Sequence, residues 1–212
     1  MKTFSIVLTY YEDPENLSRA LYCLSQQTYE DFEVIPFFDG PDAKAEFMYR
    51  QFCAKKNDDR FRPAVIVPTT KLGSHHGNDI RHAAMAYCHK DYIIWYGHDC
   101  LIDKDYLQTH AEQIKDDRCI SVVSQEHFTW WDHMQSWTLY RETLPRTMDP
   151  SSLRMAKVDL LNFALPADVA REWAWRKEHR KKYEADWFTL WDCMQGSGLP
   201  VRISDKVVCA HF

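Results

Sequence analysis

Four side chains that could bind a metal ion or move a proton follow strand-like or helix-like stretches: Asp39, Asp99, Asp186 and His211. The apolar and aromatic run at residues 92–96 predicts a buried strand, and Asp99 follows it after a break at Gly97. Open α/β sheets bind ligands outside the carboxyl ends of their strands. Asp99 is therefore a candidate for handling a metal ion or a phosphate, although for a lone acid a solvated loop residue is the commoner explanation.

The usual motifs of several enzyme classes are missing. The first predicted strand is followed by Thr9-Tyr10-Tyr11-Glu12 rather than by a Gly-x-Gly-x-x-Gly turn, so a hydride-transfer enzyme is a poor fit. The sequence has no Gly-x-Ser-x-Gly elbow and no His-Glu-x-x-His helix. The acids at the strand ends remain as the candidates for chemistry.

The composition predicts one soluble domain over residues 1–212. The chain is 45% hydrophobic, which is enough for a sizeable core. A net charge of −5 does not indicate nucleic-acid binding, although it leaves room for a local basic groove. Seven cysteines without a Cys-x-x-Cys pair indicate reduced thiols. With no signal peptide and no apolar run near the roughly 18 residues that span a bilayer, we expect a cytoplasmic protein.

Short strands alternate with amphipathic helices over residues 1–123. We expect strands at residues 4–8, 32–38, 64–67, 92–96 and 119–123, and helical stripes at residues 17–24, 45–52 and 80–87. Asp13 and Pro14 should begin the first helix, and Asp103 should be the N-cap of another helix that buries Leu107 and Ile114. This alternation predicts an α/β fold with a mostly parallel sheet covered on both faces.

The second half is less regular. We expect loops and short elements over residues 127–150, a strand over 158–165, a helix over 167–182, another helix ending at Gly196-Ser197-Gly198, and terminal strands at 201–203 and 207–209. The cationic run at residues 176–182 is either a solvated face or a contact for phosphate or nucleic acid. The aromatic stretch at residues 128–137 either stacks against a sugar or base or covers the core.

A series of segments occurs in a characteristic order along nearly the whole chain. It begins with Phe4-Ser5-Ile6-Val7-Leu8-Thr9-Tyr10, Ser25-Gln26-Gln27-Thr28-Tyr29-Glu30-Asp31-Phe32-Glu33 and Phe38-Asp39-Gly40. It continues with Gly73, Ile80-Arg81-His82-Ala83, the strand that ends at His98-Asp99, then Glu184-Ala185-Asp186-Trp187, Gly198-Leu199-Pro200 and His211. This series resembles the family-2 glycosyltransferases with the GT-A fold, a Rossmann-like arrangement of three layers.

The resemblance implies an enzyme that transfers a sugar from a nucleotide-diphosphate donor, with a UDP-sugar as first choice. The acceptor hydroxyl would belong to a glycan, a lipid-linked sugar or a modified nucleic acid. Residues 1–123 would bind the donor, and residues 124–212 would bind the acceptor and supply a terminal metal ligand. Thr9, Tyr11, Asp39, Arg81 and His98 would bind the nucleotide.

The resemblance also implies a divalent cation and a base. Asp99 and His211 would bind Mn²⁺ or Mg²⁺, which stabilises the charge that grows on the diphosphate leaving group. An imidazole ligand favours Mn²⁺. Asp186 would take the proton of the acceptor hydroxyl, which implies inversion at the anomeric carbon. Glu184 and Asp192 are competing candidates for this base.

The sequence departs from the family pattern at the strand end. Gly97 stands where the Asp-x-Asp motif has its first acid, so that only the second acid, Asp99, is kept. We expect weaker metal binding, for which His98 could compensate. The alternative to an enzyme is a non-catalytic module that binds a sugar nucleotide or a glycan. Asp39 could likewise be only a turn former, and His211 only a packed residue.

Overall fold

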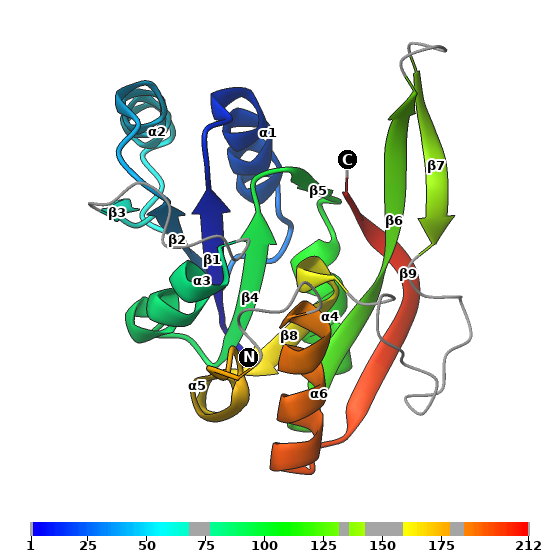
Figure 1. The fold of residues 1–212 in the computed structure, drawn as a ribbon. Coiled ribbons are helices and arrows are strands. Elements are labelled where there is room, and N and C mark those ends of the chain that lie inside the picture. Colours follow the sequence, from blue (N-terminus) through cyan, green and yellow to red (C-terminus); the bar gives the residue numbers. More distant parts are fainter. Residues whose placement is uncertain (1, 68–76, 132–135, 143–158, 179–184, 212) are drawn as a thin grey trace.

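The computed structural model describes residues 2–67, 77–131, 136–142, 159–178 and 185–211, and it shows a mixed sheet between two layers of helices (Figure 1). The strands are β1 (Phe4–Tyr10), β2 (Phe32–Phe38), β3 (Val65–Ile66), β4 (Tyr92–Gly97), β5 (Cys100–Ile102), β6 (Ile120–Trp131), β7 (Ser136–Glu142), β8 (Phe163–Pro166) and β9 (Val201–His211). The α-helices are α1 (Pro14–Ser25), α2 (Ala43–Lys56), α3 (Asn78–Ala84), α4 (Tyr106–Gln113), α5 (Ala167–Trp173) and α6 (Ala185–Ser197), with 3₁₀ turns η1 (Met85–Tyr87) and η3 (Leu160–Asn162).

The sheet has the strand order β3-β2-β1-β4-β8-β6-β9-β5, and β7 pairs with β6. β1 runs parallel to both β2 and β4, and its register sets Thr9 opposite Phe37 and Gly97. The carboxyl ends of these three strands therefore meet at one edge of the sheet. β8 then joins the first half of the chain to the second, because it pairs antiparallel with both β4 and β6.

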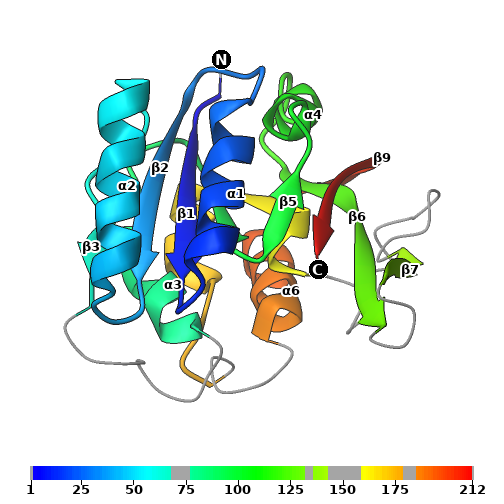
Figure 2. The same cartoon turned by 90° about the horizontal axis from the view of Figure 1, so that it is seen from above.

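Side chains of the central strands point alternately to two apolar cores, as the period of a strand requires. Phe4, Ile6 and Leu8 of β1 and Ile94 and Tyr96 of β4 pack under α1 and α4 with Leu17, Leu21 and Leu107. Val7, Ile93 and Trp95 point the other way and pack with Ala84, Val169 and Leu190 of α3, α5 and α6. Figure 2 shows α1, α2 and α4 on one side of the sheet and α3 and α6 on the other. The predicted α/β fold with a covered sheet is confirmed.

The N-terminal half matches the predicted elements closely. The Asp13 carboxylate caps α1 by accepting the backbone N–H of Asn16 at 3.1 Å, as expected. The predicted N-cap of α4 is wrong by two residues, because α4 begins after Asp105. Asp103 instead belongs to a turn: its N–H donates to Val208 at 2.8 Å, and its carboxylate accepts the N–H of Asp105 at 2.9 Å.

The second half differs more from the predicted elements. Residues 127–150 were expected to form loops and short elements; in the described part, β6 continues to Trp131 and pairs with β7. The expected strand over 158–165 is a 3₁₀ turn followed by β8, and the expected helix over 167–182 ends at Trp173 in its described part. The two terminal strands are one continuous strand, β9. These pairings join residues far apart in sequence, so no local pattern reports them.

Gly196 has a different role from the expected helix cap. It lies inside α6, where an added Cβ would come within 2.2 Å of the Trp173 ring, so a glycine lets α6 approach α5 closely. The helix ends at Ser197, just before Gly198, whose φ of 63° is left-handed.

All seven cysteines are free, in agreement with the expected reduced thiols. Within the described ranges, no helix is both long and apolar enough to span a membrane.

Candidate active site

The carboxyl ends of β1, β2 and β4 are joined by hydrogen bonds between three of the predicted nucleotide-binding residues and their neighbours. The backbone N–H of His98 donates to the Thr9 carbonyl at 3.2 Å, and the backbone N–H of Asp39 donates to the Tyr10 carbonyl at 2.9 Å. The His98 Nδ1 atom is also 3.2 Å from the Thr9 carbonyl oxygen. Because a carbonyl oxygen only accepts, this hydrogen bond requires the proton on Nδ1, and in the neutral imidazole Nε2 is then the acceptor.

Tyr10, part of the Thr9-Tyr10-Tyr11 turn that was expected to hold the nucleobase, packs against this edge of the sheet. Its buried ring lies 4.8 Å from the Phe38 ring and 5.3 Å from the His98 ring, between centroids. Its hydroxyl donates to Asp42 at 2.5 Å, while Asp42 also caps α2 by accepting the N–H groups of Lys44 and Ala45. Burial and the Asp42 carboxylate together raise the pKa of Tyr10 above its usual value, so the hydroxyl stays protonated as a donor.

Gly97 leaves room for the carboxylate of Asp99. A Cβ added at Gly97 would lie 2.6 Å from Asp99 Oδ1, so the Asp99 side chain occupies the space beside the position of the missing first acid. The same oxygen accepts the thiol of the buried Cys100 at 3.6 Å. Tyr11 follows β1 directly, and its hydroxyl contact with Glu12 raises its pKa. The predicted donor-binding residues Thr9, Tyr11, Asp39, His98 and Asp99 therefore all follow or end the three central strands.

One predicted metal ligand, Asp99, lies in the turn between β4 and β5, and the other, His211, ends β9. β5 pairs antiparallel with β9 so that His211 is opposite Cys100, the residue after Asp99. Among the described side chains, no cluster of three or more His, Cys, Asp or Glu groups could hold a metal ion. The Asp99 carboxylate, supplemented by an imidazole, is nevertheless a donor set that suits Mn²⁺.

Arg81 and Asp186, from opposite halves of the chain, meet on the α3 and α6 side of the sheet. Arg81 Nη1 is 3.8 Å from Asp186 Oδ1 in the first turn of α6, and it donates to Asn78 at 2.8 Å. The guanidinium carbon is 5.5 Å from the centroid of the buried Trp175 ring. The choice between Asp186 and Asp192 as the base stays a prediction, and Glu184 lies outside the described residues.

Trp175 and Trp95 were not predicted to be part of the site. The Trp95 indole N–H on β4 donates to the Arg81 carbonyl at 3.2 Å, and its ring packs edge to face on Trp175 at 5.6 Å. Trp175 adopts a left-handed φ of 55°, and its N–H donates to Thr189 at 3.2 Å. The sequence signal that could have found these two tryptophans is the high tryptophan content of the chain, eight in 212 residues.

Three other sequence features lie outside the described side chains: the stretch 128–137, residues 179–182 of the cationic run, and Gly73.

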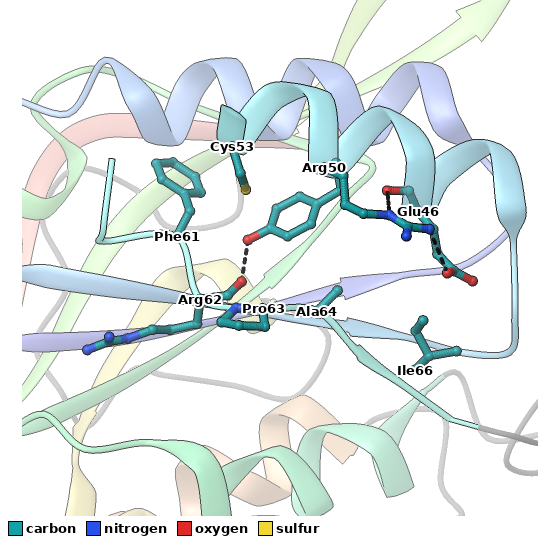
Figure 3. A pocket seen from close by; sticks show the side chains of 9 residues that line it. Glu46, Arg50, Cys53, Phe61, Arg62, Pro63, Ala64 and Ile66 are labelled. Atoms are coloured by element: carbon teal, nitrogen blue, oxygen red, sulfur yellow. Dashed lines mark hydrogen bonds and ion pairs between the residues drawn. The ribbon is translucent and has the colours of Figure 1, made fainter. Parts of the chain in front are cut away.

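A cavity of about 440 Å³ lies away from these residues, between α2 and residues 61–66 (Figure 3). Its charged groups are already engaged: Arg50 pairs with Glu46, and Arg62 pairs with the buried Glu33. The Tyr49 hydroxyl donates to the Arg62 carbonyl at 2.5 Å across the base of the cavity. None of the predicted site residues lines this cavity, so it is not part of the candidate active site.

Comparison with known proteins places the chain in a family. Residues 5–163 match the model of glycosyl transferase family 2, so the chain belongs to that family. A search of curated proteins found no match. A structure of TarS from S. aureus has a TM-score of 0.73 at 13% identity, covering 99% of this chain and 60% of that chain. The mannosyltransferase PcManGT from Pyrobaculum calidifontis, in complex with GDP-Man and Mn²⁺, has a TM-score of 0.70 at 12% identity, covering 99% of this chain and 56% of that chain.

These structural likenesses establish the GT-A fold that the sequence predicted. Other TarS structures contain UDP or UDP-GlcNAc, at 13% identity to this chain. The chain spans only about 60% of the length of the TarS structure and 56% of the length of PcManGT.

Proposed function

We propose that the protein is an inverting glycosyltransferase that transfers a sugar from a UDP-sugar to an acceptor hydroxyl, with the help of a divalent cation. Family membership and the nucleotide-sugar complexes of the structural neighbours support the reaction class. The observation that carries the proposal is the edge where β1, β2 and β4 end, because it gathers Thr9, Asp39, His98 and Asp99. Ligands of open α/β sheets bind at such edges.

Each residue has a role in this proposal. Thr9, Tyr11 and Asp39 bind the base and ribose, and His98 offers the lone pair of Nε2 to a ribose hydroxyl. Arg81 binds the diphosphate through its guanidinium. Asp186 takes the acceptor proton as the acceptor oxygen bonds to the anomeric carbon. The bond from that carbon to the diphosphate oxygen breaks, and its electron pair leaves with the nucleoside diphosphate. Attack on the face opposite the leaving group inverts the anomeric centre.

The cation would be held by Asp99 and His211, and their oxygen and nitrogen donors favour Mn²⁺ over Mg²⁺. When bound, it supplies positive charge to the diphosphate leaving group. The donor would lie mainly over residues 1–123 and the acceptor over residues 124–212. The acceptor is a glycan, a lipid-linked sugar or another molecule with a free hydroxyl.

The first experiment measures melting temperature with UDP, GDP, CDP and dTDP, each with and without Mn²⁺. A ligand at about 100 times its Kd stabilises a protein by about 2.7 kcal/mol, so a donor site gives a clear upward shift. We expect the largest shift with UDP and Mn²⁺. No shift with any of the four nucleotides would contradict the donor site.

The second experiment measures turnover of a panel of nucleotide sugars. Asp186→Asn removes the base and should lower turnover by about 10²- to 10⁴-fold without weakening nucleotide binding. Asp192→Asn, on the same helix, is the matched control and should retain activity. Nucleotide binding without turnover of any donor, and no effect of Asp186→Asn, would identify a binding module in place of an enzyme.

A further inference from the structure

The side chain of Arg81 has hydrogen-bonding capacity that the described residues do not use. Its Nη1 donates to Asn78 at 2.8 Å, but it is 3.8 Å from Asp186, a distance at which the pair is held by charge without a direct hydrogen bond. The Nε–H group is buried and has no hydrogen-bond partner among the described residues. An unsatisfied buried N–H costs about 1–3 kcal/mol, so an oxygen atom supplied by a ligand would be stabilising there.

The backbone of Arg81 is anchored to β4, whereas its guanidinium is held by one hydrogen bond, to Asn78, and by the longer contact with Asp186. The Arg81 carbonyl accepts the indole N–H of Trp95, two residues before Gly97 on β4, so the start of the side chain is anchored to the strand that leads to Asp99. The guanidinium lies over the Trp175 ring at 5.5 Å, a contact with little directional preference. Moving the group across the indole breaks one directional bond, the 2.8 Å hydrogen bond from Nη1 to Asn78, and oxygen atoms of the diphosphate would replace it.

We propose that Arg81 is shared between Asp186 and the donor diphosphate, so that donor binding draws the guanidinium away and releases Asp186 to act as the base. This inference rests on the proposed function. A diphosphate offers several anionic oxygens in the geometry that a guanidinium prefers, so it competes well with a carboxylate at 3.8 Å.

This arrangement makes the base strong only when a donor is present. A guanidinium beside a carboxylate stabilises the ionised form and weakens it as a base. Moving the positive charge to the diphosphate restores the proton affinity of Asp186 at the point where an acceptor hydroxyl can be used. Because coupling between two sites is reciprocal, an ionised Asp186 must also weaken donor binding by competing for Arg81.

The test is a double-mutant cycle on nucleotide affinity, which needs no acceptor and no turnover. Isothermal titration calorimetry measures the Kd of UDP with Mn²⁺, or of whichever of the four diphosphates raises the melting temperature. Asp186→Asn should tighten binding by about threefold to fivefold, the size expected for a partly exposed ion pair. Arg81→Gln should weaken binding, and in its background Asp186→Asn should have no further effect.

The control variants separate this coupling from a general effect of charge. Glu172→Gln removes one negative charge from the neighbouring helix α5 and should leave the Kd unchanged. Arg81→Met removes the charge and keeps an apolar side chain over the Trp175 ring, so it repeats the cycle if the glutamine variant does not fold. Equal tightening by Asp186→Asn with and without Arg81, or no tightening, would overturn the coupling alone. Failure of the wild type to bind any of the nucleotides would overturn the proposed function as well.

Discussion

At the scale of single residues, the site depends on where the atoms of Asp99 lie. The sequence predicts that Gly97 stands in place of the first acid of the Asp-x-Asp motif, and the structure adds that Asp99 Oδ1 would be 2.6 Å from a Cβ at that position. The glycine is therefore needed for space beside the carboxylate. His98 contributes in the same region through a ring whose Nδ1 is held at the Thr9 carbonyl. The orientation of both side chains depends on strand pairing, which the sequence alone does not report.

Gly97→Ala tests whether the present orientation of Asp99 is the one that binds the donor and its cation. The new methyl group would force the Asp99 carboxylate to turn, because the clash is with the end of a flexible side chain. We expect the free energy of unfolding to change by less than about 1 kcal/mol. The Kd for UDP with Mn²⁺ should rise by about tenfold, which is about 1.4 kcal/mol.

Two measurements decide this prediction, urea unfolding for stability and calorimetry for affinity. Asp99→Asn serves as the comparison, because it removes the charge without adding a group at residue 97, and it should weaken binding at least as much. Unchanged affinity in Gly97→Ala would show that the orientation of Asp99 does not matter for binding.

At the scale of elements, a buried carboxylate joins the amino-terminal ends of the central strands. Glu33 on β2 accepts the Ser5 hydroxyl of β1 at 2.7 Å and the His89 N–H before β4 at 2.8 Å. Its other oxygen accepts from Arg62 at 3.1 Å. Burial alone would raise the pKa of Glu33, but the hydrogen bonds from Ser5, His89 and Arg62 outweigh it and hold the pKa below its usual value.

Glu33→Gln should destabilise the protein in a pH-dependent way. The native pKa is lower than the unfolded value of about 4.3, so the carboxylate contributes stability above that pH and loses it as the pH falls through the native pKa. At pH 7 we expect a loss of about 1–3 kcal/mol in the free energy of unfolding. The difference from wild type should shrink at about pH 3.

Urea unfolding at both pH values measures this difference. Glu30→Gln, at an exposed position before β2, is the matched control and should stay within about 0.5 kcal/mol of wild type at either pH. A Glu33→Gln deficit of the same size at both pH values would show that the carboxylate charge is not what stabilises the strands.

The elements also show which parts of the fold the sequence can predict. Strands β1 to β4 and the start of β6 were predictable because each is a short apolar run next to a helix with a clear stripe, and Asp13 capped α1 as expected, whereas the short strand β5 was not predicted. The long β6, the β7 hairpin and the single strand β9 were not, since their pairings join distant residues such as Ser121 and Arg202. The order of the motifs along the chain predicted which residues are candidates for the site. The contact between Arg81 and Trp175 could not be predicted and is seen only in the three-dimensional structure.

At the scale of the whole molecule, the two halves expected from the sequence are built into one sheet. β8 pairs with β4 through Ile93 and Leu165, and the Trp95 and Trp175 rings meet 5.6 Å apart across the same boundary. The core on the α3 and α6 side draws on both halves, with Val7 from β1 and Leu190 from α6. Neither half can lose its structure without exposing the apolar surface of the other.

We therefore expect the chain to unfold in a single cooperative transition. Tryptophan fluorescence reports mainly residues 124–212, which hold seven of the eight tryptophans, while far-UV circular dichroism reports the helices of both halves, and the two melting curves should coincide. UDP with Mn²⁺ should move both curves upward together, because a ligand bound at the β1 and β4 edge stabilises the whole cooperative unit. Two separate transitions, with only one of them shifted by the nucleotide, would instead show that residues 1–123 and 124–212 unfold as independent domains.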